Sequence, residues 1–454
     1  MCLRGNLKGM LVSKMIKVIG VGALTTLIGT QVAVAQDDMF RRDRIQGAGE
    51  RYLPEFEPRE VRLGSFKLTP ELGLGLQSNS NVYAVGSNDT TLVNGVEEQI
   101  SETSDIIVSI TPALNLTSDW GRHEIGLTTS AAHKEYTDNG DESHTNLNGF
   151  LRGRIDVSRE FNFTANVGAQ ELTERRGIFA ISQELQSDPA EYSVVTGGIA
   201  GNWQRDSLRF SLGANVRDLS YDDIRFSDDA LNDGIQNDRS YRDYTLTAYN
   251  ARAEYALSPD ISFFLSTAVS DREYDTVPTV GVKRDASGFN AQIGTSFQSS
   301  LLRGEVAVGF LREERDAAEF NDIEGLAIDT DVQWLPTPLT TVSLGVNRYT
   351  ADTGQIDLPS ALVSQGELGV VHELKRNLLL NANARYGVEE LDGSATTLGY
   401  DQDFYNIGAG AVYKMNPNVH LDFNLQFDSR ESSVENRGRT YDQTIVGVGL
   451  KLFP

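Results

Sequence analysis

Arginines that could bind anions recur with even spacing in this sequence. Arg152 and Arg154 are two positions apart, and Arg209 and Arg217 are eight apart. Because successive side chains of a β-strand point to opposite faces, residues an even number apart share a face. Guanidinium groups on one face would hold carboxylates or phosphates by paired hydrogen bonds. The candidate anion-binding residues are Arg152, Arg154, Arg209, Arg217, Arg252 and Arg385, together with Lys67 and Lys451.

Enzymatic chemistry has little support. No G-x-S-x-G motif marks a serine nucleophile. The single cysteine, Cys2, precedes any plausible signal cleavage site. Five histidines lie in different segments without the spacing of a zinc site: His123, His133, His144, His372 and His420. We therefore expect no catalytic, cofactor-binding or metal-binding residues.

Acidic residues are concentrated in segments 77–102 and 220–242. The simpler interpretation is a solvated surface. The alternative is that divalent cations bridge these carboxylates to lipopolysaccharide phosphates or to one another.

Alternating apolar residues predict the elements that would position the arginines. Every even-numbered residue from Ile106 to Leu116 is apolar, whereas Ser109, Thr111 and Asn115 lie between them. This period of two indicates a β-strand. It recurs as far as Val446–Leu452 and gives about eighteen strands, each near the 9 to 11 residues that a tilted membrane strand needs. We predict an all-β fold, a closed antiparallel transmembrane β-barrel over residues 65–454, with the arginines facing the lumen.

The connections favour a membrane barrel over a soluble sandwich. Short turns such as 158–160, 258–260 and 416–418 alternate with long polar segments. Outer-membrane barrels have short periplasmic turns and long extracellular loops. The three tryptophans, Trp120, Trp203 and Trp334, all fall beside short turns, where indoles would lie at the inner membrane interface; coincidence or local packing is the alternative.

The two ends of the chain have other roles. Residues 1–35 carry four basic residues, an apolar stretch and Ala33-Val34-Ala35, the layout of a signal peptide cleaved between Ala35 and Gln36; a membrane anchor is the alternative. Residues 36–64 lack alternation and are expected to form a periplasmic tail or small plug. At the other end Phe453 is out of phase with the apolar face of the last strand, although barrels commonly end in a lipid-facing aromatic residue.

Composition excludes two further classes. No run of about 18 apolar residues follows the signal, so helical spans are not expected. Removing the signal takes the net charge from −24 to −28, and such an acidic chain is not expected to bind nucleic acid.

The sequence also resembles a known family, called putative β-barrel porin type 2. Six segments carry the resemblance: Glu57–Pro70, Ser78–Ala84, Ser118–His123, Arg152–Arg159, Trp334–Thr341 and Val371–Leu378. One departure is Arg59-Glu60, near which relatives tend to have glycine. The resemblance implies a proteobacterial outer-membrane barrel, in a family often linked with exopolysaccharide or capsule export.

Three functions follow as hypotheses. The first is a porin-like conduit for polysaccharide or small solutes, in the outer membrane of a Gram-negative bacterium. The second is a plugged structural or assembly barrel of an exopolysaccharide system. A lipid-modifying enzyme would need a Ser/His/acid cluster that the sequence does not offer. The expected partners are outer-membrane lipid, lipopolysaccharide, the barrel assembly machinery and a polysaccharide. The lumen arginines would either brace the wall by pairing with acids such as Asp156 and Glu254, or attract carboxylates of a passing solute.

Overall fold

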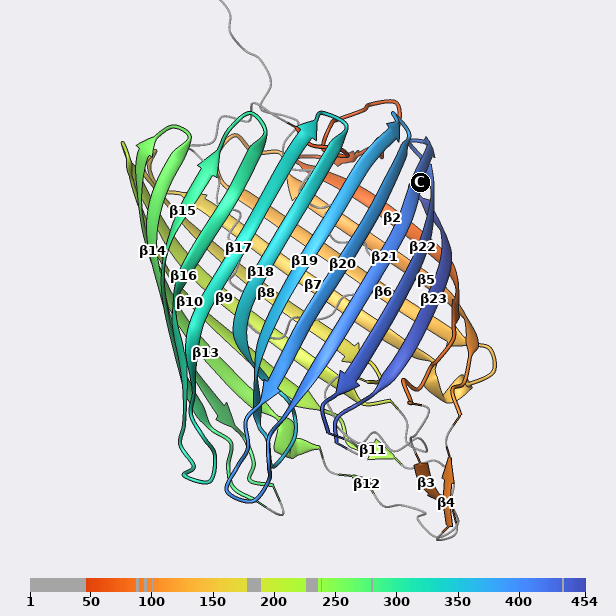
Figure 1. Ribbon diagram of the computed structural model, residues 1–454. Coiled ribbons are helices and arrows are strands. Elements are labelled where there is room, and N and C mark those ends of the chain that lie inside the picture. The colour runs from red at the N-terminus through yellow and green to blue at the C-terminus, as the bar shows by residue number, and fades with distance from the viewer. Residues whose placement is uncertain are drawn as a thin grey trace, which may run out of the picture.

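The computed structural model describes residues 46–86, 90–93, 96–99, 101–177, 189–225, 236–237, 239–278, 281–434 and 437–454. Figure 1 shows one barrel with strongly tilted strands. Besides strands, these ranges hold two single turns of 3-10 helix, η2 (Gly140–Glu142) and η3 (Ser240–Arg242). No helix in them has the length and apolar character needed to cross a membrane. The expected cleavage site between Ala35 and Gln36 lies outside the described residues.

Eighteen strands form the wall, and the short β1 (Val61–Leu63) joins them to make one sheet of 19. The wall strands are β2 (Phe66–Asn79), β5 (Asp105–Ser118), β6 (Glu124–Tyr136), β7 (His144–Asp156), β8 (Phe161–Thr173), β9 (Glu191–Arg205), β10 (Leu208–Tyr221), β13 (Tyr244–Ser258), β14 (Ile261–Tyr274), β15 (Ala286–Gln298), β16 (Leu302–Arg315), β17 (Ile323–Thr337), β18 (Thr340–Asp352), β19 (Ser360–Lys375), β20 (Leu378–Leu391), β21 (Tyr400–Asn416), β22 (Val419–Ser432) and β23 (Tyr441–Leu452). This confirms the predicted closed antiparallel barrel and its strand number.

The first and last wall strands close the barrel. β2 pairs with β23 from Leu72↔Leu452 to Asn79↔Ile445, and its other edge pairs with β5. β23 ends before it reaches the start of β2, and β1 fills the gap by pairing Leu63 with Phe66. Closure satisfies backbone groups that lipid could not.

Connections at the two ends of the barrel differ in length. One end, here called the turn end, has links as short as Asp206–Ser207 and Pro259–Asp260. The other, the loop end, has connections such as 80–104 and 222–243, which contain the small hairpins β3–β4 (Thr90–Val93, Val96–Gln99) and β11–β12 (Ile224–Arg225, Gln236–Asn237). The carboxyl terminus lies at the turn end (Figure 1). The predicted alternation of short and long connections is confirmed.

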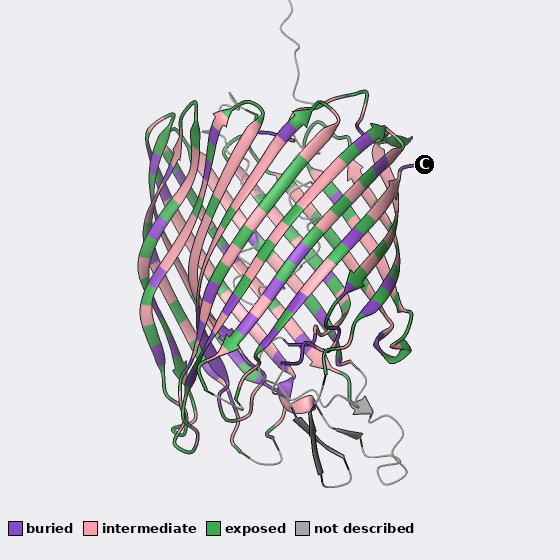
Figure 2. Ribbon diagram, turned by 45° about the vertical axis from the view of Figure 1, so that its right-hand side comes forward, coloured by how far each residue is buried: buried purple, intermediate pink, exposed green. Residues whose placement is uncertain are grey.

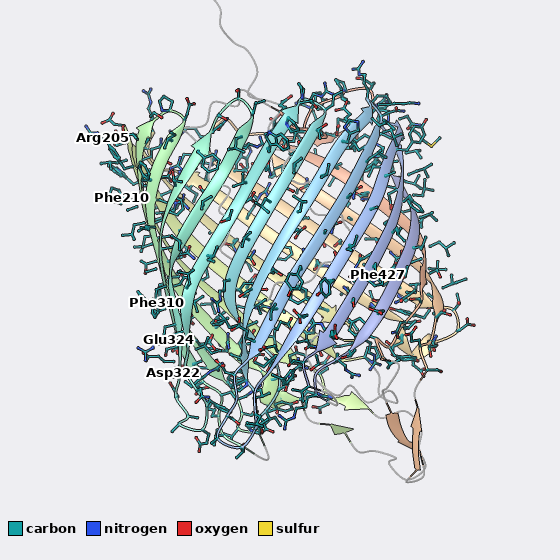
Figure 3. The ribbon with its side chains drawn as sticks, in the orientation of Figure 1. Arg205, Phe210, Phe310, Asp322, Glu324 and Phe427 are labelled. Atoms are coloured by element: carbon teal, nitrogen blue, oxygen red, sulfur yellow. The ribbon has the colours of Figure 1, made fainter. Side chains whose placement is uncertain are left out.

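The outer face is apolar along the middle of the barrel. Leu212 is 68% exposed, and Phe210, Phe310 and Phe427 are also exposed. In Figure 3 Phe210 and Phe310 lie between Arg205, near the turn end, and Asp322 with Glu324, near the loop end. An apolar band bounded by charge is the surface that a bilayer requires. Exposed and less exposed residues alternate along the strands, and buried residues gather toward the loop end (Figure 2).

Aromatic residues mark the turn end as expected. Trp120 is exposed and lies 5.6 Å from Phe66, and Trp203 lies 5.7 Å from Phe210. Phe453 behaves differently from a lipid-facing terminal residue. Its ring is buried and lies 4.9 Å from the imidazole of His420, which explains why it is out of phase with the outward face of β23.

Candidate conduction pathway

The six candidate arginines all lie on the inner face of the wall. An arginine that is adjacent in the strand to an exposed, outward-pointing apolar residue itself points inward. Leu151 and Ile155 are next to Arg152 and Arg154, and Phe210 is next to Arg209. The same phase holds for Arg217, Arg252 and Arg385 on β10, β13 and β20. Since this face encloses the lumen, the arginines form part of its lining.

The arginines differ in how far they reach into the lumen. The side chain of Arg152 is 44% exposed, with its Nε 3.5 Å from a carboxylate oxygen of Glu124. The side chain of Arg154 is 31% exposed and pairs with Asp156 at 3.3 Å. By contrast, Arg209 and its partner Glu254 are both buried, 3.5 Å apart. Arg152 and Arg154 are therefore the candidates placed to meet a solute.

A buried cluster connects β10, β13, β14 and β16. Arg252 donates to Glu305 at 2.9 Å, and Glu254 accepts a 2.5 Å hydrogen bond from Ser262. The guanidinium of Arg252 also covers the ring of Phe264, 3.6 Å from its centroid. These contacts span several strands, so Arg252 braces the wall. Glu254, one of the expected lumen acids, lies 3.5 Å from both Arg209 and Arg252.

Arg385, Lys67 and Lys451 also lie near carboxylates. Arg385 donates to Glu367 at 2.6 Å, and both side chains are partly exposed. Near the turn end, Lys67 lies 3.5 Å from Glu60 and Lys451 lies 3.6 Å from Glu71. These surface-like pairs contribute little stability individually.

Amide side chains line much of the inner face between the arginines. Gln170 donates to Asn148 at 2.7 Å across β8 and β7. Similar bonds join Asn202 to Asn162, Asn215 to Asn250 and Asn383 to Asn406. Each amide carries both donors and acceptors, so a wall built this way can exchange its hydrogen bonds with water or with hydroxyl groups.

A segment near the amino terminus, Gln46–Pro58, lies along the inside of the turn-end rim and is called the strap below. The backbone N–H of Ala48 donates to Thr341 on β18 at 2.8 Å. Glu57 pairs with Lys414 of β21 at 2.8 Å, both side chains being buried. Nε2 of His420 on β22 donates to the carbonyl of Phe56 at 2.9 Å. Contacts of one segment with β18, β21 and β22 narrow this end of the lumen. The sequence suggested a tail or small plug here but not these contacts.

Further ion pairs attach the strap to the rim. Arg51 pairs with Glu373 at 2.6 Å, and Glu50 pairs with Arg303. Glu55 pairs with Arg376 on a short turn, where both side chains are more exposed.

At the loop end β18 separates from its neighbour β17, whereas β19 stays paired with β20 as far as Ala361↔Leu391. Pairing of β18 with β17 stops at Arg348, whereas pairing with β19 continues to Asp352↔Ser360. Beyond that point Thr350 and Ser360 both donate at 2.6 Å to Glu313, an inward residue of β16. The hairpin of β18 and β19 therefore folds against the inner face of the wall and occupies part of the lumen.

Apolar packing and buried charges fix the folded-in hairpin. Leu362 packs against the inward residues Leu311, Ile323 and Ala327. Asp352 accepts a 2.7 Å hydrogen bond from Tyr274 and lies 3.9 Å from Arg284, whose side chain is fully buried. Sequence alternation could not find this arrangement, because it assigns residues to two faces and does not show that a wall strand bends inward.

Other loop-end segments contribute buried ion pairs. Arg242 of η3 donates to Glu174 at 2.7 Å, and Arg175 donates to Asp428 of β22 at 2.8 Å. Burial lowers the pKa of the Arg242 guanidinium, but the Glu174 carboxylate outweighs this and leaves the pKa raised. The arginine accordingly stays charged. The loop end is thus narrowed by a charged network that crosses between distant strands.

The class of this protein follows from the family to which it belongs. The family described as Putative beta-barrel porin 2 matches residues 53–453, which is nearly all of the described chain. The chain belongs to this family. This Putative beta-barrel porin 2 member is therefore an outer-membrane β-barrel of porin-like build, as its fold and the earlier resemblance indicated.

Solved structures similar to this porin-family chain are distant. The outer membrane protein OpdK of Pseudomonas aeruginosa is 12% identical, with 85% of this chain and 99% of that chain covered and a TM-score of 0.44. The FrpB iron transporter of Neisseria meningitidis, F5-1 variant, is 9% identical, with 81% and 64% covered and a TM-score of 0.45. No curated protein matches the chain.

The histidines of this porin-family barrel are dispersed. His133 lies 3.2 Å from Glu135 on the outer face, His372 lies 3.0 Å from Thr340, and His420 contacts the strap. Within the ranges that the structure describes, no group of three or more histidine, cysteine or acidic side chains could hold a metal ion.

Proposed function

We propose that this barrel conducts soluble molecules across the outer membrane, with acidic saccharides or small organic anions as its preferred solutes. One observation carries the proposal: Arg152 and Arg154 present partly exposed guanidinium groups to the lumen from adjacent inward positions of one strand. A fixed positive charge on the wall of a narrow aqueous path raises the local concentration of anions. The amide side chains beside these arginines offer the donors and acceptors that sugar hydroxyls need.

Export of a polysaccharide is the finer form of this proposal. It rests on the family resemblance and on a polar inner wall that extends along the strands. Polysaccharide export is tested by deleting the gene in its host. Secreted polysaccharide is then measured in the deletion strain and in the same strain complemented with the intact chain. Unchanged secretion would leave a conduit for small solutes.

The second candidate is a structural barrel that does not conduct. The strap at the turn end and the folded-in hairpin at the loop end favour it, because both occupy lumen space. Single-channel recording in planar bilayers separates the candidates. A conduit gives discrete current steps, whereas a barrel that is permanently closed by these segments gives none.

A further inference from the structure

Three inward-facing phenylalanines lie over a glycine of the neighbouring strand. Phe264 covers Gly294 and Phe404 covers Gly387, so closely that a Cβ on either glycine would clash with the ring. Both of these rings are 6% exposed. Each also has an arginine above it, Arg252 at 3.6 Å from the centroid of Phe264 and Arg430 at 5.5 Å from that of Phe404. These two rings are therefore occupied by contacts within the barrel.

Phe150 has the same arrangement but remains open. A Cβ on Gly168 would lie 2.7 Å from Cδ1 and Cε1 of Phe150, so the ring lies against the wall of β8. Phe150 is nevertheless 41% exposed. Within the described part of the chain, no arginine side chain lies over this ring. A flat apolar surface is thus presented to the lumen.

The surroundings of Phe150 are polar. On β7 the inward residues Asn146, Asn148, Arg152 and Arg154 lie on either side of it. An aromatic side chain among these polar neighbours is out of phase with the lipid-facing residues Leu147 and Leu151. The sequence contained this signal, because an apolar residue at an inward position of a polar strand face is unusual in an aqueous lumen.

Two kinds of polar group lie next to the ring. Arg152 is the next inward residue, about 6.6 Å along the strand, and its side chain leans away over Gly126 on β6, with Nε 2.8 Å from where a Cβ would lie. In the other direction along β7, Asn148 accepts a 2.7 Å hydrogen bond from Gln170. The ring is therefore flanked by a cation on one side and by an amide pair on the other.

From this arrangement we infer that Phe150, Arg152 and the Asn148–Gln170 pair form a binding site for a hexuronate unit of an acidic oligosaccharide. The C–H face of a pyranose packs on an aromatic ring, whose negative face attracts the slightly positive hydrogens. Arg152 binds the uronate carboxylate through charge-assisted hydrogen bonds. The amide pair exchanges its mutual hydrogen bond for bonds to ring hydroxyls.

The alternative is that Phe150 only shields Gly168, as the other two rings shield their glycines. That role needs a bulky apolar side chain at position 150 and no particular ring face. It also needs no cation at position 152. The two interpretations therefore predict different responses to substitutions that keep the apolar volume.

The inference rests on the proposed function, but binding can be measured without conduction. The full-length barrel in lipid nanodiscs is titrated by calorimetry with trigalacturonate, with galacturonate monomer and with the neutral trisaccharide maltotriose. Nanodiscs expose both ends of the barrel, and the same protein is recorded in planar bilayers. Binding without current steps would overturn only the conduit proposal, and steps without trigalacturonate binding would overturn only this site.

Four variants test the geometry. Phe150→Leu keeps the apolar volume and should weaken trigalacturonate binding by about three- to tenfold, the worth of an aromatic contact. Phe150→Tyr retains a ring and should bind within about twofold of the original chain. Arg152→Gln should weaken trigalacturonate by about tenfold and leave maltotriose unchanged. Phe163→Leu, a similarly exposed aromatic on the outer face of β8, is the matched control and should change neither.

Equal affinity of Phe150→Leu and the original chain would overturn the stacking role. Folding of each variant is judged by heat-modifiable gel mobility. If Phe150→Leu fails to fold, the binding measurements on Phe150→Tyr and Arg152→Gln test the site in its place. The site is supported if Arg152→Gln, and no other variant, loses selectivity for trigalacturonate over maltotriose. Unchanged selectivity in Arg152→Gln overturns the site. Tighter binding of the trimer than of the monomer supports recognition of a chain, whereas equal affinity restricts the site to free hexuronate.

Discussion

Asp352, on the hairpin of β18 and β19, accepts a 2.7 Å hydrogen bond from the hydroxyl of Tyr274 on the inner wall of β14. The two residues are 78 positions apart, and Arg284 from a third segment lies 3.9 Å from the same carboxylate. The contact fastens the tip of the hairpin inside the barrel.

Tyr274→Phe should loosen the hairpin. The substitution removes a buried hydrogen bond to a charged group, worth about 1.5 to 3 kcal/mol. Amide hydrogen exchange of residues 349–362 should then be about tenfold faster or more, because local opening becomes easier by that free energy.

Tyr386→Phe is the matched control. Tyr386 donates a hydrogen bond of the same length to Asp403, but at an exposed position. Its removal should cost no more than about 0.5 kcal/mol and leave exchange in the hairpin unchanged. Slow exchange that persists in Tyr274→Phe would show that the remaining contacts, the packing of Leu362 and the hydrogen bonds to Glu313, hold the hairpin without Tyr274.

Glu57→Gln should release the strap from the turn-end rim. The change leaves the buried ammonium of Lys414 without its carboxylate, which costs about 3 to 5 kcal/mol. The expected result is a larger single-channel conductance, because the strap then leaves the lumen. Glu55→Gln breaks an exposed pair with Arg376 and should cost about 0 to 1 kcal/mol with no change of conductance.

Deleting residues 46–58 gives the limiting case for the strap. The conductance of the deletion variant should equal or exceed that of Glu57→Gln. If the deletion variant inserts normally and conducts like the original chain, the strap does not narrow the pathway.

Much of the wall was predictable from the sequence because it follows from local periodicity. Alternation from Ile106 to Leu116 fixed both faces of β5, and Leu114 is indeed exposed. The same reasoning gave the inward phase of Arg152 and Arg209. Turn chemistry gave the short links, since glycine, proline, asparagine and aspartate interrupt the alternation at regular intervals.

Features that narrow the lumen could not be predicted in this way. The pattern in β18 continues smoothly from Val342 to Val346, yet Thr350 and Asp352 beyond it contact the inner wall. Likewise nothing local pairs Glu57 with Lys414, 357 positions later. Such contacts depend on where distant segments meet in space. Phe453 was an informative exception, because its odd phase did signal an inward contact.

Leu114→Lys should impair membrane insertion, whereas Asn115→Lys should be tolerated. The two residues are adjacent on β5 and face opposite sides of the wall. A lysine facing lipid near the middle of a strand costs about 2 to 4 kcal/mol, and one facing an aqueous lumen costs far less. Heat-modifiable gel mobility after refolding into lipid vesicles measures the folded fraction. Equal folding of both variants would contradict the assignment of the outer face to lipid.

The double variant Arg152→Gln, Arg154→Gln should shift the reversal potential in a salt gradient toward cation preference. Both guanidinium groups are partly exposed to the lumen, so they act on an ion inside the bore. At physiological salt, electrostatic interactions are screened over about 8 Å. The acidic loops beyond the loop end therefore have little electrostatic effect on an ion that is inside the bore. Local charge should therefore decide selectivity even though the chain has a net charge of −24.

Arg209→Gln is the control for this shift, because Arg209 also lies on the inner face but is buried against Glu254. Its replacement leaves a buried carboxylate with less compensation, so the variant should lose stability toward denaturant. Its reversal potential should remain close to that of the original chain, since Glu254 is buried away from the bore and Arg252, 3.5 Å away, still compensates its charge. Recording all three proteins in the same salt gradient compares them directly. A shift in Arg209→Gln as large as in the double variant would mean that overall lumen charge, and not the two exposed guanidinium groups of β7, sets ion preference.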